Sequence, residues 1–239
     1  MSGLTVNSTN EKEEKSMEPL IKVVVKVIYC IAIPVLRLIY PTKIVWEDKA
    51  ATVQVLKKPC LIYSNHTGYS DGLYMTSLLT KYNVYIFVGK DWYEKKALNW
   101  LFRNLRYIPI DRQQMDTSWI FKGVEALEKG RSIYFFPEGH TSKDGKMLEF
   151  KPGFLMLSKQ SGVPLVPICI DNKMKPFHFT RIIIGKPQTP NLKEEGRPSA
   201  VLKKHAAQCK KSILLLKKKY GNPKHATDES EEIKEDTKV

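Results

Sequence analysis

The stretch YSNHTGYSDG, residues 63–72, joins a short apolar run to a segment with helical periodicity. The apolar run at residues 60–63 is typical of a buried strand, and the pattern from Asp71 onward predicts a helix. In α/β sheets, sites are built in the turns that follow the strand ends. His66 and Asp71 lie in this turn, five residues apart, as a base and the carboxylate that orients it would.

The same alternation continues through most of the chain. Short apolar runs predict strands at residues 43–47, 60–64, 84–89, 107–111, 132–137, 164–170 and 181–185. Segments with a 3.6-residue period predict helices at residues 71–82, 94–105, 116–130, 153–161 and 199–220. We therefore expect an α/β domain with a largely parallel central sheet flanked by helices.

The segment LIKVVVKVIYCIAIPVLRLIY, residues 20–40, is apolar but carries Lys22, Lys26 and Arg37. On a helix these three basic side chains fall within roughly 60° of one another. A narrow cationic stripe on an otherwise apolar helix is typical of an amphipathic helix that lies in the membrane interface. A transmembrane span and a buried core helix are the two alternatives.

Composition divides the chain into four parts. Residues 1–19 and 222–239 are polar and charged, and we expect both to be disordered tails. Residues 20–41 form the predicted membrane-associating segment, and residues 42–221 form the α/β domain.

Charge indicates an anionic partner. The formal net charge is +14, although both ends of the chain are acidic, so the basic residues are concentrated in the middle. Nucleic acid, anionic lipid and a phosphorylated substrate all fit such a surface. The predicted helix at residues 199–220 has an apolar stripe for packing on the sheet and a lysine-rich face that anionic lipid would attract.

Four cysteines, at positions 30, 60, 169 and 209, show no CxxC pair and no zinc-ligand spacing. We expect them to be reduced thiols in a protein that faces the cytosol, and we expect no metal site.

Two more predicted strands end in residues that carry chemistry. The strand at 107–111 is followed by Arg112, and the strand at 132–137 runs into the turn that contains Glu138. Parallel strands end at one edge of a sheet, so these groups are expected to converge on His66 and Asp71.

Four motifs, in order, resemble those of the glycerolipid acyltransferases, the family typified by 1-acylglycerol-3-phosphate O-acyltransferase. They are NHTGYSDG, IPIDR, FFPEGHTS and VPLVPICI. The segments FVGKDW, with Lys90, and FKPGF, with Lys151, are similar to further positions of that family. The resemblance spans residues 63–170 and implies the fold of the glycerolphosphate acyltransferases.

The resemblance also implies a reaction. A fatty acyl group would pass from acyl-CoA or acyl carrier protein to the free hydroxyl of a lysophospholipid. His66 suits the base that takes the hydroxyl proton, and Asp71 suits its partner. The resemblance implies direct attack on the thioester, so no serine or cysteine nucleophile and no cofactor are required.

The remaining site residues are expected to bind substrate. Arg112 would clamp the acceptor phosphate, and Glu138 would hold a glycerol hydroxyl. Amides near Gly139 would face an anion, and Lys90 and Lys151 would assist Arg112.

One departure from the family pattern concerns the acceptor. The family usually has Thr-Arg after Glu-Gly, whereas this chain has His140 and Thr141. His140 would replace the missing charge in part when it is protonated. Lysophosphatidate is the first expected acceptor, and another lysophospholipid or polar lipid is the second.

Other classes of protein fit some of these features. A thioester hydrolase would use the same His66 and Asp71, and a nucleic-acid-binding protein would explain the charge. The aromatic residues are not arranged as a stacking platform, and the basic residues concentrate in the terminal helices, so we expect no nucleic-acid partner. The expected protein is peripheral or monotopic on the cytoplasmic face of an anionic membrane.

Overall fold

A computed structural model describes residues 23, 27, 30, 31, 33–95, 99, 102, 107–111, 117–141 and 146–223. The predicted tail at residues 1–19, nearly all of the predicted tail at 222–239, and Arg112 lie outside these residues. So does most of the helix predicted at residues 94–105; of its described residues, 99 and 102 are helical, whereas 94 and 95 are not.

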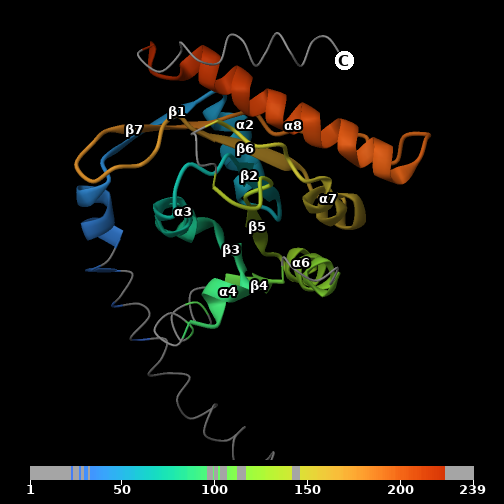
Figure 1. Cartoon of the computed structure of the whole chain (residues 1–239), viewed down its shortest axis with the longest axis horizontal. Helices are drawn as coiled ribbons and strands as arrows, with labels where there is room; N and C mark the ends of the chain where they lie inside the picture. The colour runs from blue at the N-terminus through green and yellow to red at the C-terminus, as the bar shows by residue number, and fades with distance from the viewer. Residues whose placement is uncertain are drawn as a thin grey trace, which may run out of the picture.

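A seven-stranded sheet forms the centre of the molecule, in the order β1-β7-β6-β2-β5-β3-β4 (Figure 1). The strands are β1 (Thr42–Trp46), β2 (Leu61–Ser64), β3 (Val84–Gly89), β4 (Tyr107–Ile110), β5 (Ser132–Phe135), β6 (Leu165–Ile170) and β7 (Thr180–Ile184). The five strands from β6 to β4 are parallel, β7 is antiparallel to β6, and β1 is parallel to β7. The prediction of a largely parallel sheet is therefore confirmed.

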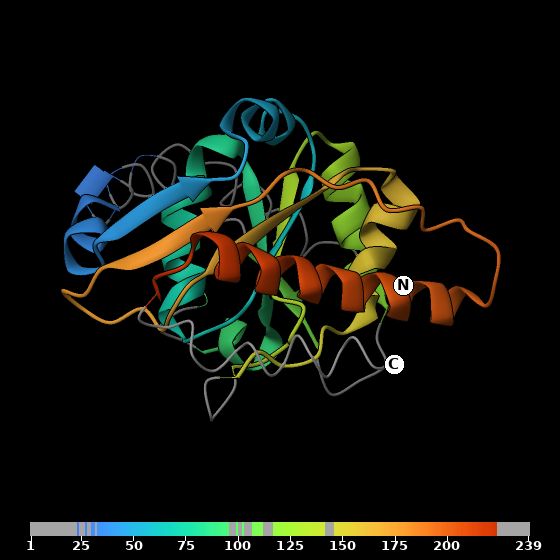
Figure 2. The ribbon, with the colours of Figure 1, turned by 90° about the horizontal axis from the view of Figure 1, so that it is seen from above.

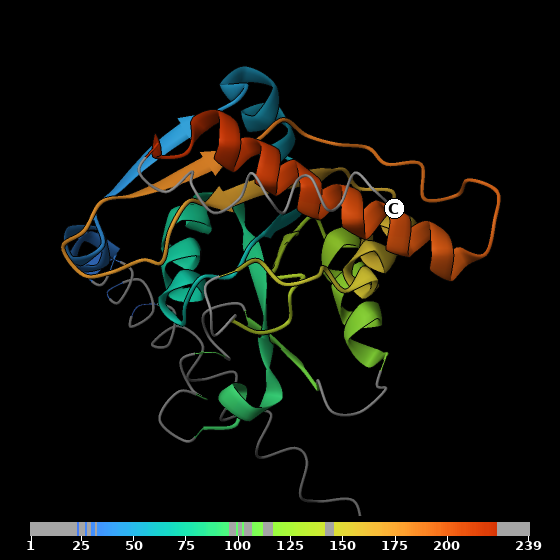
Figure 3. The same cartoon turned by 45° about the horizontal axis from the view of Figure 1, so that its top comes forward.

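Helices cover both faces of the sheet. They are α2 (Lys49–Leu56), α3 (Ser70–Leu79), η1 (Thr80–Tyr82), α4 (Lys90–Tyr93), α6 (Ser118–Glu128), η2 (Pro152–Phe154), α7 (Leu155–Ser161) and α8 (Pro198–Tyr220). Helices α6, α7 and α8 share one core with the sheet, while α2 and α3 contribute to a second core on its other face (Figure 3).

The strand β2 shows why the apolar runs are continuous. Leu61 and Tyr63 belong to the core under α6, α7 and α8, whereas Ile62 belongs to the core under α2 and α3. All three side chains are fully buried. A central strand of a parallel sheet has no solvent face, so apolar residues follow one another instead of alternating with polar ones.

Helix α8 crosses the sheet over β6 and β7 (Figure 2). Its predicted apolar stripe is confirmed, because the following side chains are all buried: Leu202, Ala206, Cys209, Ile213 and Leu216. Lys210 departs from the predicted basic face: it is buried and makes an ion pair with Glu149 at 2.5 Å. The helical pattern alone predicts Lys210 on the outward face, because it cannot reveal the ion pair with Glu149, 61 residues away in the sequence.

Helix α2 was not expected from the sequence. Asp48 caps it by accepting a hydrogen bond from the backbone N–H of Ala51 at 3.0 Å. It buries only Thr52 and Leu56 against the sheet. Two buried positions give a periodicity too weak to predict a helix from the sequence. A tertiary contact holds α2 on the sheet, because the Thr52 hydroxyl donates to the carbonyl of Gly185 at 3.1 Å.

The N-terminal segment is helical at residues 33–39. Its described apolar side chains mostly face solvent, and the exposed ones lie three or four residues apart: Val23, Val27, Ile31, Val35 and Leu38. Such spacing puts them on one side of a helix. Within the described residues, no helix has the length and apolar character needed to cross a membrane.

Candidate active site

The turn between β2 and α3 holds His66 against Asp71. The Nδ1 atom of His66 lies 3.1 Å from Oδ2 of Asp71. The side chain of Asp71 is fully buried, and that of His66 is 15% exposed. A carboxylate can only accept, so Nδ1 donates the hydrogen bond and Nε2 is left as the basic nitrogen.

Asp71 also organises the turn itself. Its Oδ2 accepts hydrogen bonds from the backbone N–H groups of Thr67 at 2.6 Å and Gly68 at 2.8 Å. Its Oδ1 accepts from the Thr67 hydroxyl at 3.1 Å. Asp71 lies in the first turn of α3, where the helix dipole favours negative charge. These contacts hold the carboxylate in the geometry that orients the imidazole.

Two further contacts fix the position of His66. The side-chain amide of the preceding Asn65 donates to the carbonyl of Ile170 at 2.9 Å and accepts from its N–H at 2.8 Å. This pair ties the end of β2 to the end of β6. The ring of Phe136 stacks on the imidazole, with ring centroids 4.1 Å apart and planes inclined by 21°.

Glu138 connects the turn after β5 to the same histidine. Its Oε1 accepts from the backbone N–H of His66 at 2.6 Å, and its Oε2 accepts from the N–H of Leu148 at 2.8 Å. Glu138 is 2% exposed. Burial raises the pKa of its carboxyl group, and the two backbone hydrogen bonds offset part of that rise.

Lys151 lies beside the glycine that follows Glu138. Gly139 has φ +79°, and a Cβ atom there would lie 3.0 Å from the Nζ atom of Lys151. The Gly139 N–H donates to the carbonyl of Phe136 at 3.1 Å, so it is already used within the turn. The ammonium of Lys151 thus occupies the space that a side chain at position 139 would need.

Lys90 is placed differently. It begins α4 at the end of β3, and its Nζ lies 3.6 Å from Asp111 and 3.9 Å from Glu94. Two carboxylates therefore pair with Lys90, whereas no carboxylate among the described residues pairs with Lys151.

The protein-family model called acyltransferase matches residues 42–171, which is more than half of the chain. The chain belongs to the acyltransferase family. The resemblance seen in the four sequence motifs is thus confirmed, and the matched segment contains the strands from β1 to β6 and the connections between them.

Curated relatives of this acyltransferase carry one activity in their names, 1-acyl-sn-glycerol-3-phosphate acyltransferase. A chloroplastic protein of Brassica napus is 31% identical over 115 residues, covering 47% of this chain and 33% of its own. A Salmonella typhimurium protein is 34% identical over 89 residues, covering 37% and 36%. A Saccharomyces cerevisiae protein is 27% identical over 135 residues, covering 54% and 43%. The chain therefore spans about a third to two fifths of the length of these relatives.

A solved structure shows the same fold. The crystal structure of the 1-acyl-sn-glycerophosphate acyltransferase PlsC from Thermotoga maritima matches with a TM-score of 0.56 and 21% sequence identity. The match covers 88% of this chain and 85% of that one. It supports the α/β architecture built on a mostly parallel sheet.

The predicted site residues of this acyltransferase fall into three groups. His66, Asp71 and Glu138 form one hydrogen-bonded cluster. Around the Glu138 turn, Gly139 is packed by Lys151, His140 is exposed and Thr141 is half-buried. Lys90 is in ion pairs with Asp111 and Glu94, and Arg112 lies outside the described residues.

Three residues of the cluster were not singled out from the sequence. Asn65 ties β2 to β6, Thr67 contacts Asp71, and Phe136 stacks on the imidazole. Asn65 could have been identified from the sequence, because an amide directly after a buried apolar strand requires hydrogen-bond partners. Phe136 could not have been identified in this way, since in the sequence it is one more residue of an apolar run.

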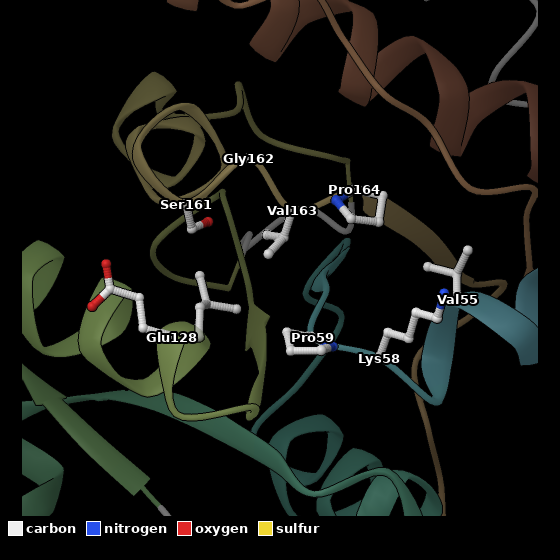
Figure 4. A pocket seen from close by; sticks show the side chains of 9 residues that line it. Val55, Lys58, Pro59, Glu128, Ser161, Gly162, Val163 and Pro164 are labelled. Carbon is white, nitrogen blue, oxygen red and sulfur yellow. The ribbon is translucent and has the colours of Figure 1, made fainter.

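A surface hollow of about 400 Å³ lies at the other edge of the sheet (Figure 4). Pro59 and Pro164, which precede β2 and β6, line it together with Val163. Lys58, Glu128 and Ser161 are its polar lining residues. It thus opens at the amino-terminal ends of the strands, away from His66.

Proposed function

We propose that this chain is an O-acyltransferase. It moves a fatty acyl group from acyl-CoA or acyl carrier protein to the free hydroxyl of a lysophospholipid, with 1-acylglycerol-3-phosphate as the first acceptor and phosphatidate as the product. The observation that carries the proposal is the contact between His66 and the buried Asp71 at the carboxyl-terminal edge of the sheet. The names of the curated relatives supply the acceptor class.

In the proposed mechanism, Nε2 of His66 takes the proton of the acceptor hydroxyl as its oxygen attacks the thioester carbonyl carbon. Asp71 stabilises the imidazolium that forms. The carbon–sulfur bond then breaks, and the proton passes from His66 to the departing thiolate. The acyl group is thereby transferred in one displacement, with the ester and a free thiol as products.

The three buried cysteines support this direct route. A nucleophilic thiol needs a lowered pKa and access to the substrate. Burial raises the pKa of Cys60 to about 11 and that of Cys209 to about 12, and Cys169 is fully buried. Cys60 also lies at the amino-terminal end of β2, at the edge opposite His66.

The phosphate of the acceptor requires positive charge near His66. Lys151 is the described candidate, because it lies beside the turn that contains Glu138 and makes no ion pair within the described residues. Arg112 is the second candidate, from its position in the motif IPIDR. Glu138 is assigned to hold the backbone of His66, because each of its carboxylate oxygens already accepts a backbone N–H.

A lipid acceptor fits the predicted location. The N-terminal segment at residues 20–41 would hold the enzyme as a peripheral or monotopic protein on an anionic membrane, at its cytoplasmic face. The exposed apolar side chains at Val23, Val27 and Ile31 support this, because an interfacial helix buries such a side in lipid.

The test is purified protein with an acyl-CoA or an acylated carrier protein and a panel of lysolipids, with the products read by mass. Formation of phosphatidate from 1-acylglycerol-3-phosphate supports the proposal. Product from a different lysolipid alone would move the acceptor to the second choice. Thiol release that does not depend on any acceptor would identify a thioester hydrolase instead.

A further inference from the structure

The loop between β6 and β7 presents two phenylalanines to solvent. Phe177 is 75% exposed and Phe179 is 78% exposed. They are among the most exposed large apolar residues of the described chain. Two exposed aromatic rings so close together on one loop are a candidate site of interaction.

The backbone of this loop is fixed rather than free. The N–H of Phe177 donates to the carbonyl of Ile39 at 2.6 Å, and the N–H of Thr180 donates to the carbonyl of Pro41 at 3.1 Å. Both acceptors lie at the end of the N-terminal helical segment, and the loop runs beside that segment in Figures 2 and 3. Phe177 has φ +61°, a conformation that an aromatic residue seldom adopts. The two hydrogen bonds thus hold the phenylalanines in an outward position.

Basic residues lie close to the pair in the sequence and beside the backbone contacts of the loop. Lys173 and Lys175 precede it on the loop, and both are exposed. Arg37 on the helical segment and Lys43 on β1 are exposed next to the same backbone contacts. From Asn172 to Arg181 the sequence contains no acidic residue. Apolar side chains next to basic ones complement an anionic bilayer. The anionic headgroups attract the lysines, and the bilayer interior accepts the aromatic rings.

We infer that the loop at residues 172–179 is a second membrane-docking element, which inserts Phe177 and Phe179 into an anionic lipid surface. This inference deepens the proposed function, since it assigns a further membrane contact to the same enzyme. The loop is joined to the N-terminal segment at Ile39, next to the exposed Leu38.

The loop leaves the sheet at the catalytic edge. Ile170, the last residue of β6, is hydrogen-bonded on both sides to Asn65, which precedes His66. A Cβ atom at Gly68 would lie 3.6 Å from the side chain of Lys173. Docking through this loop therefore places the bilayer next to the turn that carries the catalytic base, where a lysolipid acceptor would enter.

The test compares the Phe177→Ser/Phe179→Ser double variant with wild-type full-length protein in vesicle co-sedimentation. Vesicles of phosphatidylcholine with phosphatidylserine supply the anionic surface, and pure phosphatidylcholine supplies the neutral one. The inference predicts that the double variant binds anionic vesicles at least roughly tenfold more weakly, because each ring loses most of its burial in lipid. Lys175→Gln should reduce the preference for anionic over neutral vesicles.

Phe121→Ser is the matched control. Phe121 is 68% exposed on α6, which packs on β5 and on β4, the edge strand farthest from β7 and β1. Its removal should leave vesicle binding unchanged. Equal losses in this control and in the double variant would overturn the inference.

Two further readings separate the inference from its rivals. The double variant should keep its activity on a short-chain acceptor dispersed as monomers, and His66→Ala should bind vesicles as wild type does. Vesicle binding is measured without turnover, so it tests the loop even if the proposed reaction is wrong. Unchanged vesicle binding together with loss of a dimer in analytical ultracentrifugation would assign the patch to a second copy of the chain and overturn the inference.

Discussion

The two edges of the sheet have opposite characters. At the carboxyl-terminal edge, His66, Asp71 and Glu138 are almost enclosed, and each carboxylate oxygen has a hydrogen-bond partner. At the amino-terminal edge there is a hollow of about 400 Å³, but its polar residues Glu128 and Lys58 are exposed. This hollow is thus at the edge with less organised chemistry.

The difference shows what a candidate site requires. A cavity supplies room, whereas general base catalysis requires a nitrogen whose hydrogen-bond partner is fixed. The carboxyl-terminal edge provides this because three strand ends bring their turns together there. Substitutions at the two edges should therefore have unequal effects.

The largest effect is expected for His66→Ala. Loss of the general base should lower kcat by roughly 10²–10⁴ while the fold is kept. Asp71→Asn should also impair turnover, because the imidazolium loses its charged partner. Steady-state kinetics on 1-acylglycerol-3-phosphate, with circular dichroism as the fold control, measures both. Retention of half the wild-type turnover by His66→Ala would rule out the mechanism.

Arg112→Ala should have the second largest effect. A charge-assisted hydrogen bond contributes about 1.5–3 kcal/mol, so its loss should raise the KM for lysophosphatidate roughly ten- to a hundredfold. The KM for the acyl donor should change much less. Thr141→Arg should be tolerated, since it restores the residue that the family pattern has there. If Arg112→Ala is harmless and a lysolipid without a phosphomonoester is preferred, Arg112 does not clamp a phosphate.

Glu138→Gln should destabilise the protein and slow turnover together. A glutamine can accept with only one side-chain oxygen, so the backbone N–H of His66 or of Leu148 would face an NH₂ group. An unpaired buried N–H costs about 1–3 kcal/mol in unfolding free energy. Chemical denaturation measures the loss, and Glu128→Gln, on the exposed surface of α6, is the matched control.

The difference in unfolding free energy between wild type and Glu138→Gln should depend on pH, and this dependence tests whether the buried carboxyl group is the cause. Burial raises the pKa of Glu138 above its ordinary value of 4.5, so the folded protein binds this proton more tightly than the unfolded chain does. The carboxyl group therefore stabilises the fold most below pH 4.5 and loses that contribution as pH rises through the folded-state pKa. The unfolding free energy of wild type minus that of the variant should fall across this window. A difference that rises with pH would contradict the assignment.

Lys151→Ala should weaken lysophosphatidate binding more than Lys90→Ala does. Lys151 lies over the Gly139 turn without a carboxylate partner in the described chain, whereas Asp111 and Glu94 already neutralise Lys90. We expect a several-fold rise in KM for Lys151→Ala, because one charged hydrogen bond is lost. Competition by inorganic phosphate should weaken in parallel. Equal rises in KM for Lys151→Ala and Lys90→Ala would contradict the predicted difference between the two lysines.

The smallest effects are expected at the hollow on the amino-terminal edge. Lys58→Ala and Ser161→Ala should leave kcat and KM unchanged, because neither residue is near His66. A loss of turnover with normal stability in either variant would show that both edges take part in function.

Local pattern was sufficient to predict several parts of this protein. The alternation of apolar runs and helical periods predicted all seven strands, with boundaries that differ by no more than two residues. The spacing from His66 to Asp71 was readable because both residues belong to one short turn. The apolar stripe of α8 was readable because it repeats along a single helix.

Tertiary structure decided the contacts between distant segments. The bond from Glu138 to the backbone of His66 joins residues 72 apart, and it required β5 to pair beside β2. The direction of β7 and the pairing of Lys90 with Asp111 likewise depend on which strands are neighbours. The outward setting of Phe177 depends on a hydrogen bond to Ile39. Periodicity reports only which side of its own element a residue occupies, whereas these partners are chosen by the order and register of the strands across the sheet.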